Sequence, residues 1–187
     1  GFAAVASADG SVRIFSFNAS CNGVQWAATP IVLGGSESET PLVGFSESGE
    51  QLLVVSRRHS LSQTSNENGQ EGAPAATLFA LSANGSAWQA SQEMWLEDAF
   101  AAFFEDWTED SAEVLWYQMS FDGGFAIGSV RVTRASDAHL FLVRLDVVNG
   151  SSEAFIIANG TEETDVAPLA LLRTERDSFQ VAVGDLQ

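Results

Sequence analysis

The sequence predicts an all-β protein made of repeated four-stranded antiparallel units of about 62 residues. Two observations carry this prediction. The stretch "PLVGFSESGEQLLVVS" at 41–56 is matched without a gap by "FFEDWTEDSAEVLWYQ" at 103–118, 62 positions later. Apolar runs of four to eight residues, rich in Val, Leu, Ile and Phe, are also bounded throughout by Gly, Asn, Ser and Asp, as strands are bounded by hairpin turns.

The elements of a unit follow in a fixed order. Each unit holds a short strand centred on a phenylalanine, and these strands lie at 13–18, 77–82 and 139–144, with Phe15, Phe79 and Phe141 in the equivalent place. A turn and a second aromatic follow each strand, at Trp26, Trp88 and Phe155. The next elements are a loop, the strand before "SESG", the "QLLVV" strand and a variable loop.

The hairpin at 41–56 is expected to place Phe45, Leu52 and Val54 in the core and "SESGE" in solvent. A weaker third copy of it occurs at 171–184. The matched hairpins share only what a packed β layer needs. We therefore expect function to lie in the unmatched loops, 57–75 and 119–137.

One segment departs from the β pattern. Ala and Phe recur at helical spacing over 93–107, but the matching part of the preceding unit contains Pro30, Gly34 and Gly35, which argue against a helix. We expect a strand over 102–107 and allow a helical turn before it.

Four strands in roughly 60 residues is the spacing of a β-propeller blade with long loops, so a propeller-like arrangement is expected. The chain is interpreted as a single β-repeat domain, 1–187, with repeat pieces at about 1–20, 21–83, 84–147 and 148–187. Closed propellers need about four to eight blades, and three fit here. We therefore expect the chain to be part of a longer protein, and its two end pieces are able to complete one sheet. The alternatives are that it closes through a partner or forms a different stacked β arrangement.

The residues also resemble known propeller repeats. "GFAAVASADGSVRIFSF" resembles the end of a WD40-type blade, and "VGFSESGEQLLVVS" and "EDWTEDSAEVLWYQ" look like the hairpin of WD40-like propellers. The long loop "SLSQTSNENGQEGAPA", followed by an aromatic strand and "NGSAW", is similar to FG-GAP-like repeats of secreted proteins. The Gly-His and Trp-Asp pairs of true WD40 blades are missing from the sequence, so their hydrogen-bond network is not carried over.

Charge restricts the partners. The chain has 25 acidic residues against 8 arginines and no lysine, and its net charge of −17 repels nucleic acid and anionic membranes. No apolar run approaches the roughly 18 residues of a membrane helix, so membrane insertion is not expected. Partners are expected to be proteins, further copies of the chain or glycans. The alternative is that the acidic residues only keep the surface soluble in a salty medium.

Four Asn-x-Ser/Thr acceptors point to secretion. They lie at Asn18, Asn84, Asn149 and Asn159, and four of the seven asparagines are thus acceptors where roughly one is expected by chance. This excess favours a secreted, extracellular glycoprotein. The alternative is that Asn-Gly-Ser serves as a hairpin turn.

Signatures of catalysis and of cofactor binding are scarce, so no catalytic residue, cofactor or metal site is assigned. His59 and His139 stand apart from other metal-ligand types, and Cys21 has no histidine partner nearby in the sequence. The stretch 64–71, "TSNENGQE", resembles a Ca²⁺ loop without its leading aspartate, and a plain loop is the favoured interpretation.

Carboxylates beside aromatics are the one abundant functional group. They are Glu97, Asp98, Glu105, Asp106, Glu109, Asp110 and Glu113, among Phe100, Phe103, Phe104 and Trp107. Paired carboxylates of this kind build many glycoside hydrolases.

Three functions remain open at this stage. The favoured hypothesis is a non-enzymatic extracellular β-repeat protein that acts as a structural, adhesion or assembly module. The alternatives are a carbohydrate-active propeller enzyme and an intracellular WD40-like interaction scaffold.

Overall fold

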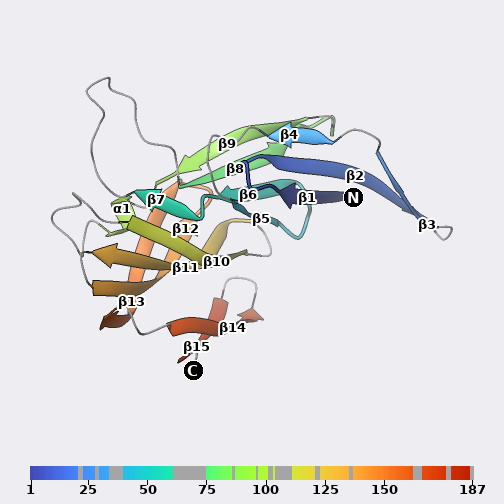
Figure 1. Ribbon diagram of the computed structural model, residues 1–187. Helices are drawn as coiled ribbons and strands as arrows, with labels where there is room; N and C mark the ends of the chain where they lie inside the picture. Colours follow the sequence, from blue (N-terminus) through green and yellow to red (C-terminus); the bar gives the residue numbers. More distant parts are fainter. Residues whose placement is uncertain are drawn as a thin grey trace, which may run out of the picture.

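The protein is all-β, as predicted, in a computed structural model (Figure 1). The structure describes residues 1–20, 23–27, 30–33, 40–60, 75–85, 87–95, 97–100, 103, 111–120, 123–134, 137–161, 166–175 and 178–185. The strands are β1 (Phe2–Ala6), β2 (Val12–Ser20), β3 (Gly23–Trp26), β4 (Ile31–Leu33), β5 (Leu42–Phe45), β6 (Gln51–Val55), β7 (Arg58–Ser60), β8 (Ala76–Leu81), β9 (Trp88–Met94), β10 (Ser111–Met119), β11 (Phe125–Arg134), β12 (Asp137–Asp146), β13 (Ser151–Thr161), β14 (Val166–Glu175) and β15 (Ser178–Asp185). A single helical turn, α1 (Glu97–Phe100), follows β9.

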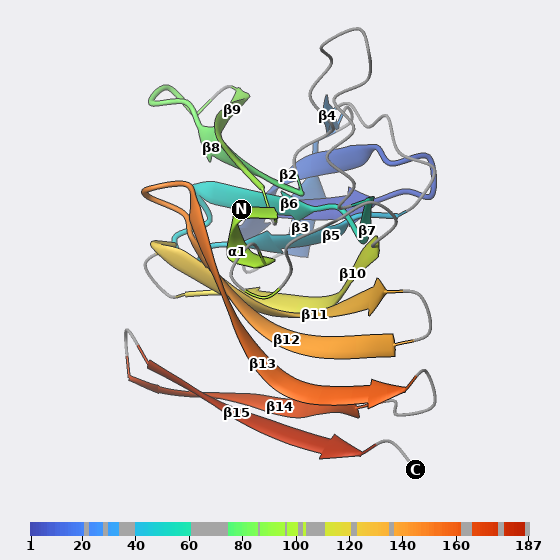
Figure 2. The same ribbon diagram turned by 90° about the vertical axis from the view of Figure 1, so that its left-hand side faces the viewer.

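The described strands form four antiparallel sheets. The N-terminal sheet has β2 at its centre, with β1 on one side and β3 and β4 on the other. The middle sheet has the order β5-β6-β8-β9, and the large sheet has the order β7-β10-β11-β12-β13. The C-terminal hairpin consists of β14 and β15 alone and lies below β13, at the end of the molecule away from the N-terminal sheet (Figures 1 and 2).

Strand β6 of the middle sheet is buried on both faces, and its sequence QLLVV is continuously rather than alternately apolar. Leu52 of β6 is fully buried toward the N-terminal sheet, where it meets Val12 and Ile14. Its neighbour Leu53 is fully buried toward the large sheet. The N-terminal and large sheets therefore cover opposite faces of the middle sheet.

The predicted core residues of the hairpin are confirmed. Leu52 is fully buried, and Phe45 and Val54 are partly buried against the same cluster. Trp88 completes it, with its ring centroid 5.4 Å from that of Phe2 and 5.8 Å from that of Phe45. Of the turn expected in solvent, Glu47, Ser48 and Glu50 are exposed, but Ser46 is buried, because its hydroxyl accepts the backbone N–H of Gln51 within the turn.

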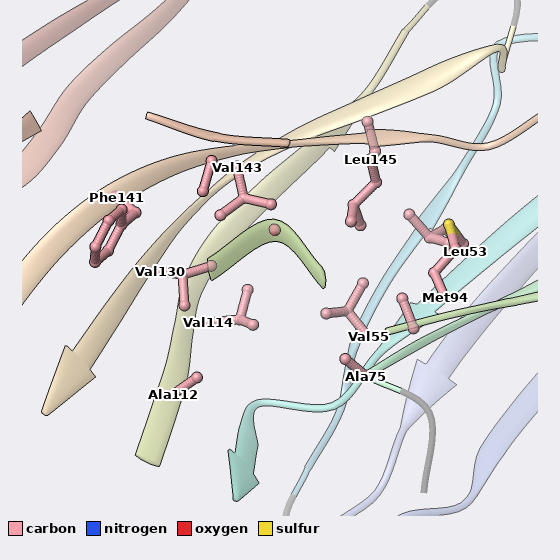
Figure 3. Close-up of a cluster of buried hydrophobic side chains, with 14 of the residues drawn as sticks. Leu53, Val55, Ala75, Met94, Ala112, Val114, Val130, Phe141, Val143 and Leu145 are labelled. Carbon is pink, nitrogen blue, oxygen red and sulfur yellow. The ribbon is translucent and has the colours of Figure 1, made fainter. Parts of the chain in front are cut away.

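The larger cluster fills the space between the middle and large sheets. Figure 3 shows Leu53 and Val55 from one side facing Val114 and Leu145 from the other. Tyr117 of β10 reaches across this space, and its hydroxyl donates a 2.7 Å hydrogen bond to the carbonyl oxygen of Leu53. Each fully buried leucine in such a cluster contributes about 1.5–3 kcal/mol.

The same Ser-x-x-Gly turn closes four hairpins: β1–β2 (Ser7–Gly10), β5–β6 (Ser46–Gly49), β8–β9 (Ser82–Gly85) and β10–β11 (Ser120–Gly123). In each turn the glycine N–H donates to the serine carbonyl, and the glycine has a φ between 69° and 77°, which L side chains rarely adopt. In the last three, the serine hydroxyl also accepts the backbone N–H five residues later. The turn is therefore a structural marker of the repeat.

By this marker, the counterpart of the hairpin at 41–56 is β10–β11 and not the stretch 103–118. Ser46 and Ser120 are 74 positions apart, and Ser7 and Ser82 are 75 apart, whereas the expected period was 62. The predicted match aligned β6 with β10, because both contain an apolar run of similar length, QLLVV and EVLWY. Strand sequence alone does not tell the first strand of a sheet from the second.

Two local predictions have clear outcomes. The segment 119–137, expected as a loop, is mostly strand β11, so that prediction was wrong. The helical turn allowed before 102–107 is confirmed as α1. Of the strand expected over 102–107, only Phe103 lies within the described residues, and it is in a turn; the rest lies outside them.

Candidate interaction surface

The outward face of the N-terminal sheet carries an uncovered apolar surface. Alternation along β1, β2, β3 and β4 turns Val12, Ile14 and Leu33 into the core and the intervening residues outward. We call this surface the outer face; its members are Ala3, Val5, Phe15, Phe17, Ala19, Val24, Trp26 and Val32, with Arg13 as the one charged residue. Val5, Val24, Trp26 and Val32 are 50%, 53%, 56% and 57% exposed.

Most of the large hydrophobic side chains that the structure shows exposed therefore lie on this one sheet. The described residues contain only three others, Phe103, Val148 and Phe155. Single exposed hydrophobics are ordinary, but a contiguous apolar patch on one sheet face is typical of an interaction site.

An aromatic pair forms the end of the outer face. The rings of Phe17 and Trp26 lie across the β2–β3 pair, with centroids 4.9 Å apart. Gly1 packs directly on the Phe17 ring, so closely that an added Cβ would overlap it. Beside the pair is an open depression of about 330 Å³, lined by Phe17 and Trp26 of the outer face and by Asn18 and Gln25, which alternate to the opposite face.

Arg13, the charged residue of the outer face, is bound by side chains of the β1–β2 turn. Arg13 donates to the hydroxyl of Ser7 and lies 3.9 Å from the carboxylate of Asp9. Hydrogen bonds from the Ser11 side chain and backbone, with a smaller contribution from Arg13, lower the pKa of Asp9. These contacts draw the charge toward the β1–β2 turn, and the remainder of the face stays apolar.

One edge of the N-terminal sheet is also open. Within the described residues β1 pairs only with β2, and β15 pairs only with β14. Unpaired strand edges present backbone donors and acceptors that can bind a further strand.

The predicted glycosylation residues lie on the surface wherever their side chains are described. Asn18 is exposed on β2, and Asn84 and Asn149 are exposed at hairpin turns. At Asn149 the amide nitrogen donates to Asp146, whose pKa is lowered mainly by the backbone N–H of Asn149. Asn159 lies on β13, and its side chain is outside the described set.

The residues considered for catalysis or metal binding form no site among the residues that the structure describes. Glu113 lies 3.7 Å from Arg131 in a partly exposed ion pair across β10 and β11. Glu97 and Asp98 lie on α1, and their side chains are not described. The other candidates fall outside the described residues: Glu105, Asp106, Glu109, Asp110, Phe104, Trp107, Cys21 and the loop 64–71. His59 lies on β7, and His139 lies beside Phe141 with ring centroids 6.4 Å apart.

The described residues contain no group of three or more His, Cys, Asp or Glu side chains placed to hold a metal ion. Within the same residues, no helix is long and apolar enough to cross a membrane.

Sequence reasoning missed the outer face, although a signal for it exists. Phe15, Phe17 and Ala19 alternate with polar or core residues along β2, and Val24 and Trp26 repeat the alternation along β3. Phe15 and Trp26 were interpreted only as markers of the repeat, and Phe17 was given no role. Their alternation with inward residues would have indicated a second apolar face.

Comparison of the chain with protein-family models, with curated proteins and with solved structures finds no match.

Proposed function

We propose that this chain is a non-enzymatic, extracellular β-repeat protein that works as a structural, adhesion or assembly module by binding proteins through its N-terminal sheet. The observation that carries the proposal is the outer face, on which four large hydrophobic side chains are at least half exposed. Each Å² of apolar surface that is exposed to water costs about 25 cal/mol of free energy. Binding of a partner that covers the outer face is therefore favoured.

We further propose that the sheets are arranged as in a β-propeller. The support is the succession of antiparallel meanders, β5-β6-β8-β9 and then β10-β11-β12-β13, that pack face to face through apolar residues. Extracellular location is supported by the exposed side chains of three of the four glycosylation acceptors, Asn18, Asn84 and Asn149. Intact mass of the native protein tests this part; unmodified asparagines would contradict it.

Oxidative footprinting tests the binding surface. In the native assembly Trp26 is expected to be protected from hydroxyl radicals, and in the diluted, isolated chain it should react as a half-exposed tryptophan. Val148, which is 74% exposed in the β12–β13 turn, is the internal control and should react equally in both states. Equal reactivity of Trp26 in the two states would refute binding through the outer face.

The second candidate function is a glycosidase, motivated by the carboxylates beside Trp107. A glycan-hydrolysis screen tests it, with Glu105→Gln and Glu109→Gln as the deciding variants. Activity that disappears in either variant would replace the proposal of a binding module, and we expect no activity.

A further inference from the structure

We infer that N-linked glycans on Asn18, Asn84 and Asn149 gather at one end of the molecule, where they shield the hairpin turns and leave the outer face free for a protein partner. The inference rests on the proposed extracellular function and deepens it, because it names a surface that partners do not contact. It starts from the place of the three acceptors in the sheets.

The three acceptors lie at the same kind of connection, the one that leads into the last strand of a sheet. Asn18 is two residues before the end of β2, which is followed in the sheet by β3. Asn84 and Asn149 each lie three residues after the end of a strand, in the β8–β9 and β12–β13 turns. One acceptor of this kind therefore occurs in each of the N-terminal, middle and large sheets.

The connections of the N-terminal and middle sheets lie at the same end of the molecule. Because β1 runs antiparallel to β2, its first residue, Phe2, lies toward the β2–β3 connection. The ring centroid of Phe2 is 5.4 Å from that of Trp88, which follows the β8–β9 turn. The centroid of Trp88 is in turn 5.8 Å from that of Phe45, which precedes the β5–β6 turn. In Figure 1 this end is marked by β3.

The large sheet places its turns at this end as well. A Cβ added to Gly123, in the β10–β11 turn, would lie 3.3 Å from the Cβ of Ser46 in the β5–β6 turn. The β12–β13 turn is bound to the same turn, because the N–H of Val147 donates a 2.9 Å hydrogen bond to the carbonyl oxygen of Gly124. We call the end formed by the connections β2–β3, β5–β6, β8–β9, β10–β11 and β12–β13 the turn end.

A role in turn formation does not account for all three acceptors. Asn84 and Asn149 are each followed by a glycine with a φ of 69°, as hairpin turns require. Asn18 lies on strand β2 instead, and its acceptor sequence Asn-Ala-Ser has no glycine. The feature that the three positions share is the Asn-x-Ser pattern, which favours glycan attachment.

The folded chain can carry the glycans without losing the contacts of its turns. All three asparagines are exposed. The nitrogen of Asn149 donates to Asp146 at 3.1 Å, and an amide nitrogen has two hydrogens, so one hydrogen keeps this bond when the glycan replaces the other. In the β8–β9 turn the Ser82 hydroxyl donates to the oxygen of Asn84, which a glycan does not modify.

Glycans at these positions leave the outer face uncovered. Asn18 points to the side of β2 opposite to Phe17 and Ala19, which belong to the outer face. Asn84 and Asn149 lie on the other two sheets. Because glycans are bulky and hydrated, they exclude protein contacts with the turns beneath them and direct a partner to the outer face.

Glycopeptide mapping of the native protein is the first test. Enzymatic release of the glycans in heavy-oxygen water converts each glycosylated asparagine to a labelled aspartate. We expect the label at Asn18, Asn84 and Asn149. An unlabelled asparagine at any of these three positions would overturn the inference.

Oxidative footprinting before and after glycan release locates the shielded surface. Val148 is 74% exposed in the β12–β13 turn and lies next to Asn149, so its reactivity should rise at least about twofold when the glycans are removed. Val32, which is 57% exposed on the outer face, is the internal control and should not change. An unchanged Val148, or a rise at Val32 as large as that at Val148, would contradict a shield confined to the turn end.

A glycan moved to the outer face tests the consequence for binding. Val5→Asn creates a new acceptor there in one step, because Ala6 and Ser7 follow it. Val5→Gln is similarly polar and creates no acceptor. Judged by protection of Trp26 in the native assembly, glycosylated Val5→Asn should bind at least about tenfold more weakly than Val5→Gln, whereas release of the natural glycans should not weaken binding. If Val5→Asn does not fold, footprinting of the unmodified chain still decides.

The failures of the two proposals are distinguishable. If Val148 is not shielded but the glycan of Val5→Asn abolishes protection of Trp26, the glycan arrangement is refuted and binding through the outer face stands. If Val148 is shielded but protection of Trp26 survives the glycan of Val5→Asn, binding through the outer face is refuted and the glycan arrangement stands.

Discussion

Raising the pH above about 10 is expected to destabilise this protein through one side chain, Tyr117. It is the only tyrosine of the chain, and there is no lysine. Among the side chains, only Tyr117 and Cys21 can therefore lose a proton between about pH 8 and pH 12, below the range in which arginine titrates. In the fold the Tyr117 hydroxyl donates to the carbonyl oxygen of Leu53 at 2.7 Å, and burial raises the pKa of Tyr117 well above its usual value.

The sign and size of the effect follow from proton linkage. The unfolded chain releases the Tyr117 proton at about pH 10, whereas the folded chain keeps it to a higher pH. The stability is thus fully present below about pH 10 and is lost as the pH rises toward the folded pKa. The loss approaches about 1.4 kcal/mol for each pH unit, or about 1.4 kcal/mol in total by pH 11. This is a measurable part of a typical stability of about 5–15 kcal/mol.

Urea unfolding followed by tryptophan fluorescence, from about pH 8 to pH 11.5, measures this loss. Tyr117→Phe is the matched control: it loses about 1 kcal/mol at neutral pH with the hydrogen bond, but its stability should be nearly independent of pH above 10. Cys21 is present in both proteins, so its contribution cancels in the comparison.

Two results would refute the reasoning. One is a phenolate absorbance of the folded protein that rises with an ordinary midpoint near pH 10. The other is an equal loss of stability with pH in the unmodified chain and in Tyr117→Phe. Either would mean that the Tyr117 hydroxyl is not held in the space between the middle and large sheets.

Three further predictions concern the packing and the turns, and urea unfolding measures each. Leu53→Ala should lower the free energy of unfolding by about 2–5 kcal/mol, because Leu53 is fully buried, while Val24→Ala on the exposed β3 should change it by less than about 0.5 kcal/mol. Gly49→Ala should cost about 1–2 kcal/mol through its φ of 72° alone, since nothing lies within 4 Å of an added Cβ, and Gly49→Asn should cost less. Ser120→Ala should cost about 1–3 kcal/mol, because the backbone N–H of Phe125 loses its 3.0 Å bond to a buried hydroxyl; an unchanged stability would show that this turn does not need the serine.

The fold class could be predicted from the sequence because strand patterning is local. Leu52 and Val54 alternate with residues of the opposite face, and Gly49 and Ser56 bound the run on either side. The same local pattern did not show that Leu53 and Val55 are buried as well, because a strand covered on both faces differs from a half-covered one only in what packs on it.

The order of strands within the sheets was harder to predict, because β6 and β10 both contain an apolar run and align well at the wrong spacing. Turn chemistry separates them: Ser46 and Ser120 make the same hydrogen bonds to residues three and five positions later. A glycine three residues after a serine was visible in the sequence at all four turns, but its common role needs the backbone geometry.

The charge of the chain and its uncovered sheet are consistent with each other. A net charge of −17 repels other copies over a distance of about 10 Å at 0.1 M salt, which opposes indiscriminate association. Within the outer face, however, Arg13 is the only charged side chain, and β1 has none. Repulsion therefore acts at long range, while the short-range surface remains apolar and able to form backbone bonds. A protein that only had to stay dispersed would carry charge on that edge as well, so the uncharged edge favours a specific partner.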